Sequence, residues 1–262
     1  MSDYETVLVE RRGPVGIVTL NRPESLNAFN AVQREDVKWA IREVNSDNDV
    51  RVGVLTGAGR SFSAGADLND MPSNPGRYRV EDDLEGGYKA GLMAIAEAPQ
   101  PWISAVNGAA AGIGSAYAMA CDLTVMAEDA YMYQAFAAIG LVPDGGATWH
   151  LARTLGRKRA YELMVSGEKL AAEKCLALGL CNRVVPADSL LDEAQQWALQ
   201  LAEKAPLALR YAKQSLNEAM ENDLPATIAG EARLQHLCIN SDDFREGVSA
   251  FLDKRSPAWK GR

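Results

Sequence analysis

An apolar run, Trp102-Ile103-Ser104-Ala105-Val106, leads directly into a turn rich in glycine and alanine, Asn107-Gly108-Ala109-Ala110-Ala111-Gly112-Ile113-Gly114. The run has the length and composition of a buried strand. We expect a helix over residues 115–120 and a further strand over residues 123–126. Strands that alternate with helices are typical of α/β proteins with parallel pairing, so this segment predicts that fold class.

A similar order of elements occurs nearer the N-terminus. Residues 50–56 form a β-rich run that ends in Gly57-Ala58-Gly59, and a turn of small residues follows at 63–66. Two such strand-to-glycine units suggest internal repetition of one structural unit. Residues 69–87 hold two prolines, three glycines and many charges, and they predict a mobile loop or a short irregular helix.

The beginning of the chain predicts a hairpin and a helix. Runs rich in β-forming residues at 6–12 and 15–20 flank Gly13-Pro14, which is typical of a β-hairpin. Apolar residues then recur at helical spacing over residues 31–44, and Asn30 is a suitable N-cap.

Helical patterns dominate from about residue 148 onward. Ser241-Asp242-Asp243 would cap the last helix and place acidic residues in its first turn, where the helix dipole favours them. We divide the chain into an α/β core at residues 1–195 and a C-terminal helical region at residues 196–262. The expected helices lie at residues 157–166, 171–178, 189–204, 206–220 and 242–254.

Composition and charge narrow the possible functions. The 262 residues are enough for one sizeable α/β domain, and the formal charge of −8 argues against a nucleic-acid surface, which needs clustered Lys and Arg. The four cysteines show no CxxC or Cys/His ligand spacing, so we expect reduced thiols and no metal site. No apolar run resembles a signal peptide or a membrane span, and we therefore expect a cytoplasmic protein without a membrane partner.

Short motifs that follow one another in a fixed order carry the strongest functional signal. They are Asn21-Arg22-Pro23, Leu26-Asn27-Ala28, Leu55-Thr56-Gly57, Ser63-Ala64-Gly65-Ala66-Asp67-Leu68, Ala105-Val106-Asn107-Gly108, Ala110-Ala111-Gly112-Ile113-Gly114, Cys121-Asp122 and the turn at Pro143. In this order they resemble the motifs of the enoyl-CoA hydratase/isomerase family, also called the crotonase family. The pattern is closest to the isomerase members of that family.

This resemblance implies an architecture and a substrate class. The implied fold is α/β, a crotonase-like spiral of repeated ββα units with a C-terminal helical oligomerisation region. The implied substrate is an acyl-CoA thioester, with coenzyme A as part of the substrate and no permanently bound cofactor. The implied assembly is a homotrimer or homohexamer. Apolar helix faces that a single core would not bury completely fit such an assembly: Leu190, Leu191, Ala194, Trp197, Leu201, Leu207, Tyr211 and Leu216.

The two glycine-rich turns are candidates for an oxyanion hole. By resemblance, the backbone amides of Ala66 and Ile113 would stabilise the enolate oxygen that forms on a thioester. Gly65 and Gly112 would let the backbone approach a ligand closely, and a helix that begins near Ile113 would add its positive dipole end. The alternative for each turn is structural, because small residues also occur where a helix packs closely on a sheet.

The acid/base residues distinguish the possible reactions. Family members that hydrate a double bond carry two glutamates at the positions of Ala116 and Phe136, and neither of these side chains can transfer a proton. Asp144 lies in the loop where isomerases of the family carry their acid. One carboxylate can take a proton from C2 and return it at C4. We expect the surrounding apolar residues to raise its pKa. The alternative is a turn residue, since Pro143-Asp144-Gly145-Gly146 is strong turn chemistry by itself.

Coenzyme A contacts are implied by the resemblance alone. They involve Ser25, Leu26, Ala28, Ala64, Asp67 and Leu68, together with Phe251 and Lys254, which would reach the coenzyme A bound to a neighbouring subunit. The acyl group would contact Leu68, Met71, Tyr78 and Tyr117.

The leading hypothesis is therefore an acyl-CoA double-bond isomerase that uses Asp144. A hydratase, or a hydrolase or dehalogenase of the same fold, is the first alternative. The dehalogenase mechanism needs a histidine ahead of the second glycine turn, and this chain has none before His150. Ser115 lacks an obvious histidine to activate it as a nucleophile, and His236 is more typical of a surface position. A non-catalytic RNA-binding relative is disfavoured by the acidic composition.

Overall fold

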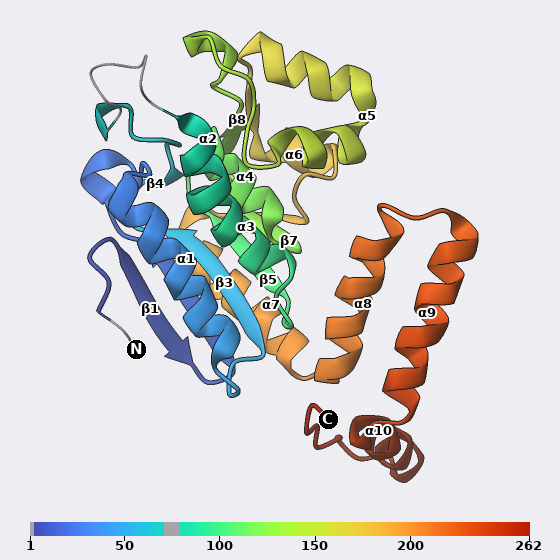
Figure 1. Cartoon of the computed structure of the whole chain (residues 1–262). Helices are drawn as coiled ribbons and strands as arrows, with labels where there is room; N and C mark the ends of the chain where they lie inside the picture. Colours follow the sequence, from blue (N-terminus) through green and yellow to red (C-terminus); the bar gives the residue numbers. More distant parts are fainter. Residues whose placement is uncertain (1–2, 71–78) are drawn as a thin grey trace.

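Two β-sheets form the centre of the protein, and helices cover them (Figure 1). The computed structural model describes residues 3–70 and 79–262. The larger sheet has six strands in the order β1-β2-β3-β5-β7-β10, in which β1 and β2 pair antiparallel and the remaining pairs are parallel. These strands are β1 (Val7–Arg12), β2 (Val15–Leu20), β3 (Val52–Gly57), β5 (Trp102–Val106), β7 (Leu123–Ala127) and β10 (Arg183–Val185). The expectation of an α/β fold with parallel pairing is confirmed.

The second sheet consists of short strands in the order β4-β6-β8-β9. We expected residues 107–114 to be a turn, but three of them form β6 and the next helix begins at Ile113 instead of residue 115. Three alanines lack the β-branched and aromatic side chains that mark a strand, so β6 depends on its pairing with β4 and β8. The strands are β4 (Ser61–Ser63), β6 (Ala109–Ala111), β8 (Tyr131–Tyr133) and β9 (Lys169–Ala171).

Local signals explain the first helix. α1 (Ala31–Ser46) begins after Asn30, whose side chain accepts a hydrogen bond from the backbone N–H of Gln33. Its buried face includes Val37 and Ile41, which have no exposed surface. The predicted N-cap and helix are confirmed.

Close packing joins β3 to β5. A Cβ on Gly53 would collide with the indole of Trp102, so the absence of a side chain at residue 53 makes room for this fully buried ring. The backbone N–H of Trp102 donates to a carboxylate oxygen of Asp122 at 2.7 Å. The Cys121-Asp122 motif thereby fixes the start of the strand that leads to the second glycine turn.

The remaining helices agree in part with the sequence patterns. The prediction for residues 69–87 is confirmed near its end by α2 and a π-helical turn at Leu84–Tyr88, while residues 71–78 lie outside the described part. Two helices, α3 and α9, were missed. The helices are α2 (Val80–Asp83), α3 (Lys89–Ala96), α4 (Ile113–Ala120), α5 (Ala147–Ser166, with a break at Gly156), α6 (Ala172–Ala177), α7 (Leu190–Ala202), α8 (Pro206–Ala219), α9 (Leu224–Ile239) and α10 (Asp242–Asp253).

The C-terminal helices extend away from the sheets (Figure 1). The boundary proposed at residue 195 falls inside α7, which packs on the larger sheet and buries Leu190 and Ala194. Leu191, Trp197 and Leu201 also pack against the core and are only partly buried, so the core covers most, but not all, of the apolar face of α7. α8 is fixed to the core by Lys213, which donates to Asp122 at 2.8 Å and to the carbonyl of Ile95 at 2.7 Å.

Candidate active site

A cavity of about 180 Å³ lies where the two glycine-rich turns, the segment before α5 and the helix pair α1 and α2 meet. It brings together Asp144, Ala66 and Ile113, which are far apart in the sequence. The lining residues are Phe29, Arg34, Ala64, Gly65, Ala66, Asp67, Leu68, Asp70, Val80, Asp83, Leu84, Tyr88, Gly112, Ile113, Ala135, Phe136, Ile139, Leu141 and Asp144.

The first glycine turn presents a free amide to this cavity. Ala66 forms an isolated parallel bridge with Phe29, in which the carbonyl of Gly65 accepts from Phe29 at 2.7 Å and the N–H of Asp67 donates to Phe29 at 2.9 Å. Both neighbours of Ala66 therefore face Phe29, and the N–H of Ala66 itself points to the opposite side. Within residues 3–70 and 79–262, this N–H has no acceptor.

The second glycine turn presents another amide. Ile113 is the first residue of α4, so its N–H has no partner inside the helix, and no other described residue accepts from it. Gly112 has a φ of 51° and a ψ of −127°, a conformation that side chains disfavour. The positive end of the α4 dipole adds to the partial charge of this amide. The cavity thus holds two amides that can bind an oxyanion.

Side chains behind the cavity hold the second amide in place. Ser115 donates a hydrogen bond from Oγ to the carbonyl of Gly112 at 2.7 Å, and this carbonyl belongs to the same peptide group as the N–H of Ile113. Gln134 donates from Nε2 to Oγ of Ser115 at 2.9 Å, which directs the hydroxyl hydrogen toward Gly112. Ser115 is fully buried and committed to these bonds. Ser115 therefore has a structural role, and its hydrogen bonds do not support the hypothesis of a serine nucleophile.

Asp144 approaches the two amides on a tight turn. Its carbonyl accepts from Ala147 at 3.0 Å, and Gly145 and Gly146 have φ values of 58° and 81°. The side chain is half-buried, and Oδ1 is buried without a hydrogen-bond donor among the described residues. Burial raises the pKa of Asp144 to about 6, against a smaller lowering by a backbone hydrogen bond.

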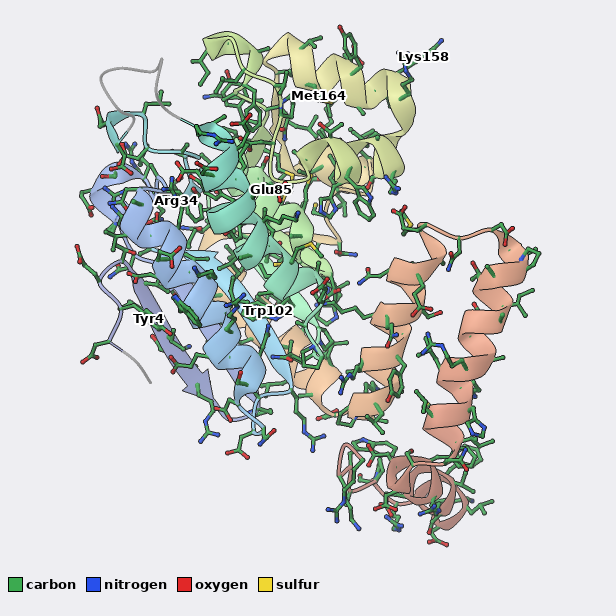
Figure 2. All side chains as sticks on the ribbon, viewed as in Figure 1. Tyr4, Arg34, Glu85, Trp102, Lys158 and Met164 are labelled. Atoms are coloured by element: carbon green, nitrogen blue, oxygen red, sulfur yellow. The ribbon has the colours of Figure 1, made fainter. Side chains whose placement is uncertain are left out.

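Other carboxylates in the cavity wall already have partners. Asp67 pairs with Arg22 at 3.1 Å, and the pKa of Asp67 is lowered because hydrogen bonds from Arg22 and Asn69 outweigh the effect of burial. Asp70 accepts from the backbone N–H of Ala31 at 2.8 Å. Asp83 pairs with Arg34 at 2.9 Å, and Figure 2 shows Arg34 on α1 beside α2. Among the described lining residues, Asp144 is therefore the carboxylate without a side-chain or backbone donor at Oδ1.

The two positions where hydratases carry glutamates are filled with apolar groups. Ala116 is fully buried on α4, and a Cβ on Gly145 would stand 3.0 Å from its Cβ. Phe136 lines the cavity, and its ring lies 3.7 Å from the place of a Cβ on Gly112. Neither side chain carries a carboxylate that could hold a water molecule.

Comparison with known proteins agrees with this geometry. The family model described as enoyl-CoA hydratase/isomerase matches residues 10–262. The chain belongs to the enoyl-CoA hydratase/isomerase family. It is 40% identical to the 1,2-epoxyphenylacetyl-CoA isomerase of Escherichia coli, over 98% of this chain and 99% of that protein, and 39% identical to a probable enoyl-CoA hydratase of Rhodobacter capsulatus, over 99% of each.

Solved structures of the same family confirm the crotonase-like fold. A crystal structure of an enoyl-CoA hydratase from Polaromonas sp. JS666 superposes with a TM-score of 0.92 at 35% identity, and covers 97% of this chain and 99% of its own. Another, of an enoyl-CoA hydratase subunit from Geobacillus kaustophilus, has a TM-score of 0.92 at 34% identity and covers both chains completely. The protein is thus an enzyme of the hydratase/isomerase family, and both reaction names occur among its relatives.

The two segments that the family resemblance assigns to coenzyme A binding, residues 25–28 and 64–68, lie together beside the cavity. Ala64, Asp67 and Leu68 line the cavity. Arg22 ties this segment to the other one, because its guanidinium pairs with Asp67 and donates to the carbonyl of Ala28 and, at 3.4 Å, to Oγ of Ser25. Leu26 begins a left-handed turn with a φ of 52°. Ser25, Leu26 and Ala28 are adjacent to the cavity without lining it.

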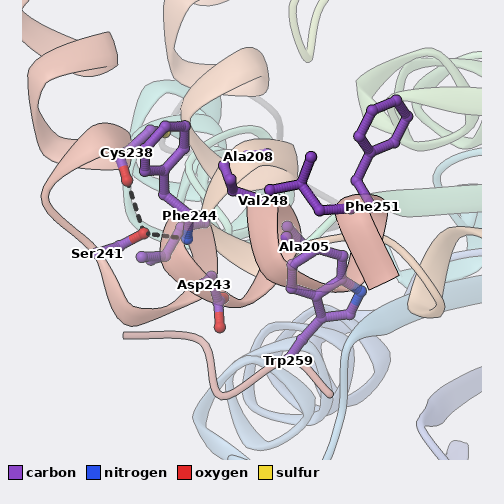
Figure 3. A pocket seen from close by; sticks show the side chains of 12 residues that line it. Ala205, Ala208, Cys238, Ser241, Asp243, Phe244, Val248, Phe251 and Trp259 are labelled. Carbon is purple, nitrogen blue, oxygen red and sulfur yellow. Dashed lines mark hydrogen bonds between the residues drawn. The ribbon is translucent and has the colours of Figure 1, made fainter. Parts of the chain in front are cut away.

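Phe251 and Lys254 do not reach the cavity within one subunit. Phe251 is 83% exposed and lines an apolar groove between α8, α10 and the C-terminus (Figure 3). Lys254 ends α10 in a left-handed conformation with a φ of 53°. The groove has a volume of about 420 Å³ and is larger than the cavity around Asp144. Its one carboxylate, Asp243, accepts from the backbone amides of Lys260 and Gly261, so we find no acid/base group there.

Several other predictions for the site can be compared with the structure. Leu68 lines the cavity as expected, whereas Tyr117 lies behind Phe29 and does not line it; Met71 and Tyr78 fall outside the described residues. His150 packs against Trp149, and burial lowers its pKa to about 4. In the described part of the chain no cluster of three or more metal-binding side chains occurs, and no helix could cross a membrane.

Two lining residues, Arg34 and Tyr88, were not predicted from the sequence. Arg34 lies on α1 one turn beyond the N-cap, and Tyr88 ends the π-helical turn Leu84–Tyr88. Neither belongs to a motif, and the glycines before Tyr88 obscure its helical position. Their place in the site follows only from the packing of α1 against the segment that leads into α3.

Proposed function

We propose that this enzyme shifts a double bond in an acyl-CoA thioester, from the 3-enoyl to the 2-enoyl position or in a related isomerisation, with Asp144 as its single acid/base. The observation that carries the proposal is the environment of Asp144. It is the carboxylate of the cavity that lacks a partner, its pKa is raised to about 6, and its turn packs on Ile113, one of the two residues with a free amide.

Asp144 both removes the proton and returns it, so the reaction needs no second acid/base group. The ionised carboxylate of Asp144 removes a proton from C2 of the thioester, and the electron pair moves onto the thioester oxygen as the enolate forms. The N–H groups of Ala66 and Ile113 hold that oxygen. The electrons return through C2 and C3 to C4, where the carboxylic acid of Asp144 gives back the proton, so that the conjugated 2-enoyl product leaves and the carboxylate is restored.

Hydration of a 2-enoyl thioester is the second candidate, because several relatives carry hydratase names. Hydration requires a group that holds and activates a water molecule while another group supplies a proton. Ala116 and Phe136 provide neither group at the positions that the family uses, and the remaining carboxylates of the wall are paired. The structure therefore supports the isomerase more than the hydratase.

The absorbance of the conjugated enoyl thioester distinguishes the two reactions. The enzyme is incubated in separate reactions with a 3-enoyl-CoA and a 2-enoyl-CoA of the same chain length. We expect absorbance to rise with the 3-enoyl substrate, while the 2-enoyl substrate stays unchanged or reverts slightly. Loss of absorbance with the 2-enoyl substrate, together with a hydroxyacyl product, would establish hydration and would contradict the proposal.

We also propose that subunits assemble as trimers, singly or doubled to hexamers, and that Phe251 and Lys254 contact the coenzyme A of a neighbouring subunit. Exposed apolar side chains on the C-terminal helices support assembly, among them Leu224, Phe251 and Leu252 at 71%, 83% and 72% exposure. Analytical ultracentrifugation at micromolar concentration tests this, and a monomer would contradict it. The coenzyme A contacts of Ser25, Leu26, Ala28, Ala64, Asp67 and Leu68, and the cytoplasmic location, remain predictions.

A further inference from the structure

A buried phenol in the cavity wall has no part in the proton transfer described above. Tyr88 lines the cavity and is 5% exposed. Its Oη is buried, and no described residue forms a hydrogen bond of normal geometry with it. A buried hydroxyl without a partner costs free energy, and because Tyr88 lines the cavity, a bound ligand can supply the missing acceptor.

No described residue accepts the hydrogen of Tyr88 at hydrogen-bonding distance, although the carboxylates of Asp144 and Asp83 are near enough to contribute to its raised pKa. The Arg34 guanidinium lies 5.3 Å from the centroid of the Tyr88 ring, and Arg34 can only donate. Phe29 packs edge-on against the ring with centroids 5.8 Å apart and offers no oxygen. Burial raises the pKa of Tyr88 to about 12, so the phenol keeps its proton at neutral pH. Tyr88 is thus a fixed hydrogen-bond donor in the wall.

The local fold fixes this donor. Tyr88 closes the π-helical turn Leu84–Tyr88, a wide helical turn that is common at functional sites. The same wall contains the ion pair between Arg34 and Asp83 at 2.9 Å. Because Asp83 offsets the charge of Arg34, this part of the cavity suits a neutral oxygen better than a carboxylate.

We infer that Tyr88 forms a polar subsite for the acyl group, and that the preferred substrates carry a neutral oxygen acceptor, such as a carbonyl, ether or hydroxyl oxygen, beyond C3 of the acyl chain. The inference rests on the proposed function because it places the acyl group in the cavity of Asp144. The phenol donates to the substrate oxygen while Asp144 acts at C2 and C4. A plain hydrocarbon chain would leave the phenol without a partner.

Binding of unreactive thioesters tests this inference separately from the reaction. Affinities are measured by calorimetry for hexanoyl-CoA and for saturated ketohexanoyl-CoA thioesters with the carbonyl at C4 or C5. We expect at least one keto thioester to bind the wild-type enzyme about tenfold more tightly than hexanoyl-CoA. We expect Tyr88→Phe to remove that preference. Equal affinity of all the thioesters for the wild-type enzyme would overturn the inference.

Tyr117→Phe is the matched control. Tyr117 is also fully buried, its Oη also lacks a partner among the described residues, and its ring stacks on Phe29 at 5.0 Å, but it does not line the cavity. We expect this variant to keep the preference for the keto thioester. Loss of the preference in both variants would assign the effect to packing of the aromatic cluster and would overturn the subsite.

Turnover measurements distinguish a Tyr88 that binds the acyl group from a Tyr88 that acts by forming a hydrogen bond to Asp144. With a plain 3-enoyl-CoA, the midpoint of the pH profile of kcat is compared between the wild-type enzyme and Tyr88→Phe, because this midpoint reports the ionisation of Asp144 and not the affinity for the acyl group. A shifted pH profile would mean that the phenol bonds to Asp144 instead, which would overturn the inference. If the wild-type enzyme fails to isomerise any 3-enoyl-CoA but still shows the keto preference, the proposed function fails and the subsite stands.

Discussion

Gly145 packs directly on Ile113: a Cβ at residue 145 would collide with Cδ1 of Ile113 and would stand 3.0 Å from Cβ of Ala116. The turn that carries Asp144 therefore lies against the residue whose amide is the proposed oxyanion donor. The contact between the backbone of Gly145 and the side chains of Ile113 and Ala116 sets how closely Asp144 approaches the proposed oxyanion hole. This explains why a glycine follows Asp144, in a conformation with a φ of 58° that side chains rarely adopt.

Gly145→Ala should displace Asp144 from its working position. The added methyl group forces the turn away from α4, and a displacement of about 1 Å at a reacting group can lower the rate by about 100-fold. The measurement is kcat with a 3-enoyl-CoA, alongside the thermal midpoint. Gly140→Ala is the control, because Gly140 has a φ of 77° in the same loop but nothing within 4 Å of its Cβ position. Equal losses in both variants would mean that backbone strain, and not the contact with Ile113, causes the effect.

Ser115→Ala should lower kcat about tenfold with little change in KM. Without its hydroxyl, the carbonyl of Gly112 loses the bond that orients the N–H of Ile113, and removal of an oxyanion donor outright lowers rates by about 100- to 1000-fold. The red shift of a conjugated enoyl thioester on binding should shrink in parallel, because this shift reports polarisation of the carbonyl.

Ser104→Ala controls for the loss of a buried serine. Ser104 is fully buried and bonds to the carbonyl of Ala118 at 3.0 Å and to Thr124 at 2.8 Å, away from the cavity wall. It should keep the red shift and kcat even if stability falls. An unchanged red shift in Ser115→Ala would contradict a positioning role for Ser115.

The rate should depend on pH through the ionisation of Asp144. Burial raises its pKa to about 6, and only the carboxylate form can take a proton from C2. We therefore expect kcat/KM to be constant above about pH 7 and to fall about tenfold per pH unit below pH 6. A phosphate group of coenzyme A also titrates near this value, so the profile should be repeated with a pantetheine thioester. If the fall in kcat/KM below pH 6 disappears with the pantetheine thioester, the assignment of this ionisation to Asp144 is contradicted.

Ala116→Glu should fail to create a hydratase and should destabilise the fold by several kcal/mol. Ala116 is fully buried and faces Gly145, so a glutamate there would be forced either to displace the turn or to place a charge without a partner in the core. Chemical denaturation measures the loss, with Ala152→Glu on the exposed face of α5 as the control. A stable Ala116→Glu enzyme that hydrates a 2-enoyl-CoA would contradict our explanation of why hydration is absent.

Local signals in the sequence account for much of the fold. The hairpin and α1 were predicted correctly because a turn at Gly13-Pro14 and a cap at Asn30 act within a few residues. The strands β4, β6, β8 and β9 have three residues each, and their formation depends on pairing between distant segments. α9 was missed because it begins with Leu224-Pro225, a pattern that the sequence does not distinguish from a loop.

The residues of the candidate site also fall into two groups: those that local motifs predict and those whose position depends on packing. Motifs with glycines and a turn placed Asp144, Ala66 and Ile113 at one cavity, since their backbone geometry is encoded locally. Tyr88 and Arg34 carry no such signal, because their position depends on the packing of α1 against the segment before α3. The role proposed for Phe251 involves a second subunit, so no short-range pattern within the chain encodes it.

Asp144→Asn gives the most direct test of the single-carboxylate isomerase. The variant and the wild type are compared with a 3-enoyl-CoA by the rise of conjugated enoyl absorbance, with hexanoyl-CoA affinity and the thermal midpoint measured on the same samples. Asp82→Asn, at an exposed carboxylate on α2, is the control. We predict that Asp144→Asn binds hexanoyl-CoA normally and isomerises at least about 100-fold more slowly, whereas Asp82→Asn behaves as wild type. A folded Asp144→Asn enzyme that retains isomerase activity within tenfold of the wild type would contradict the proposal.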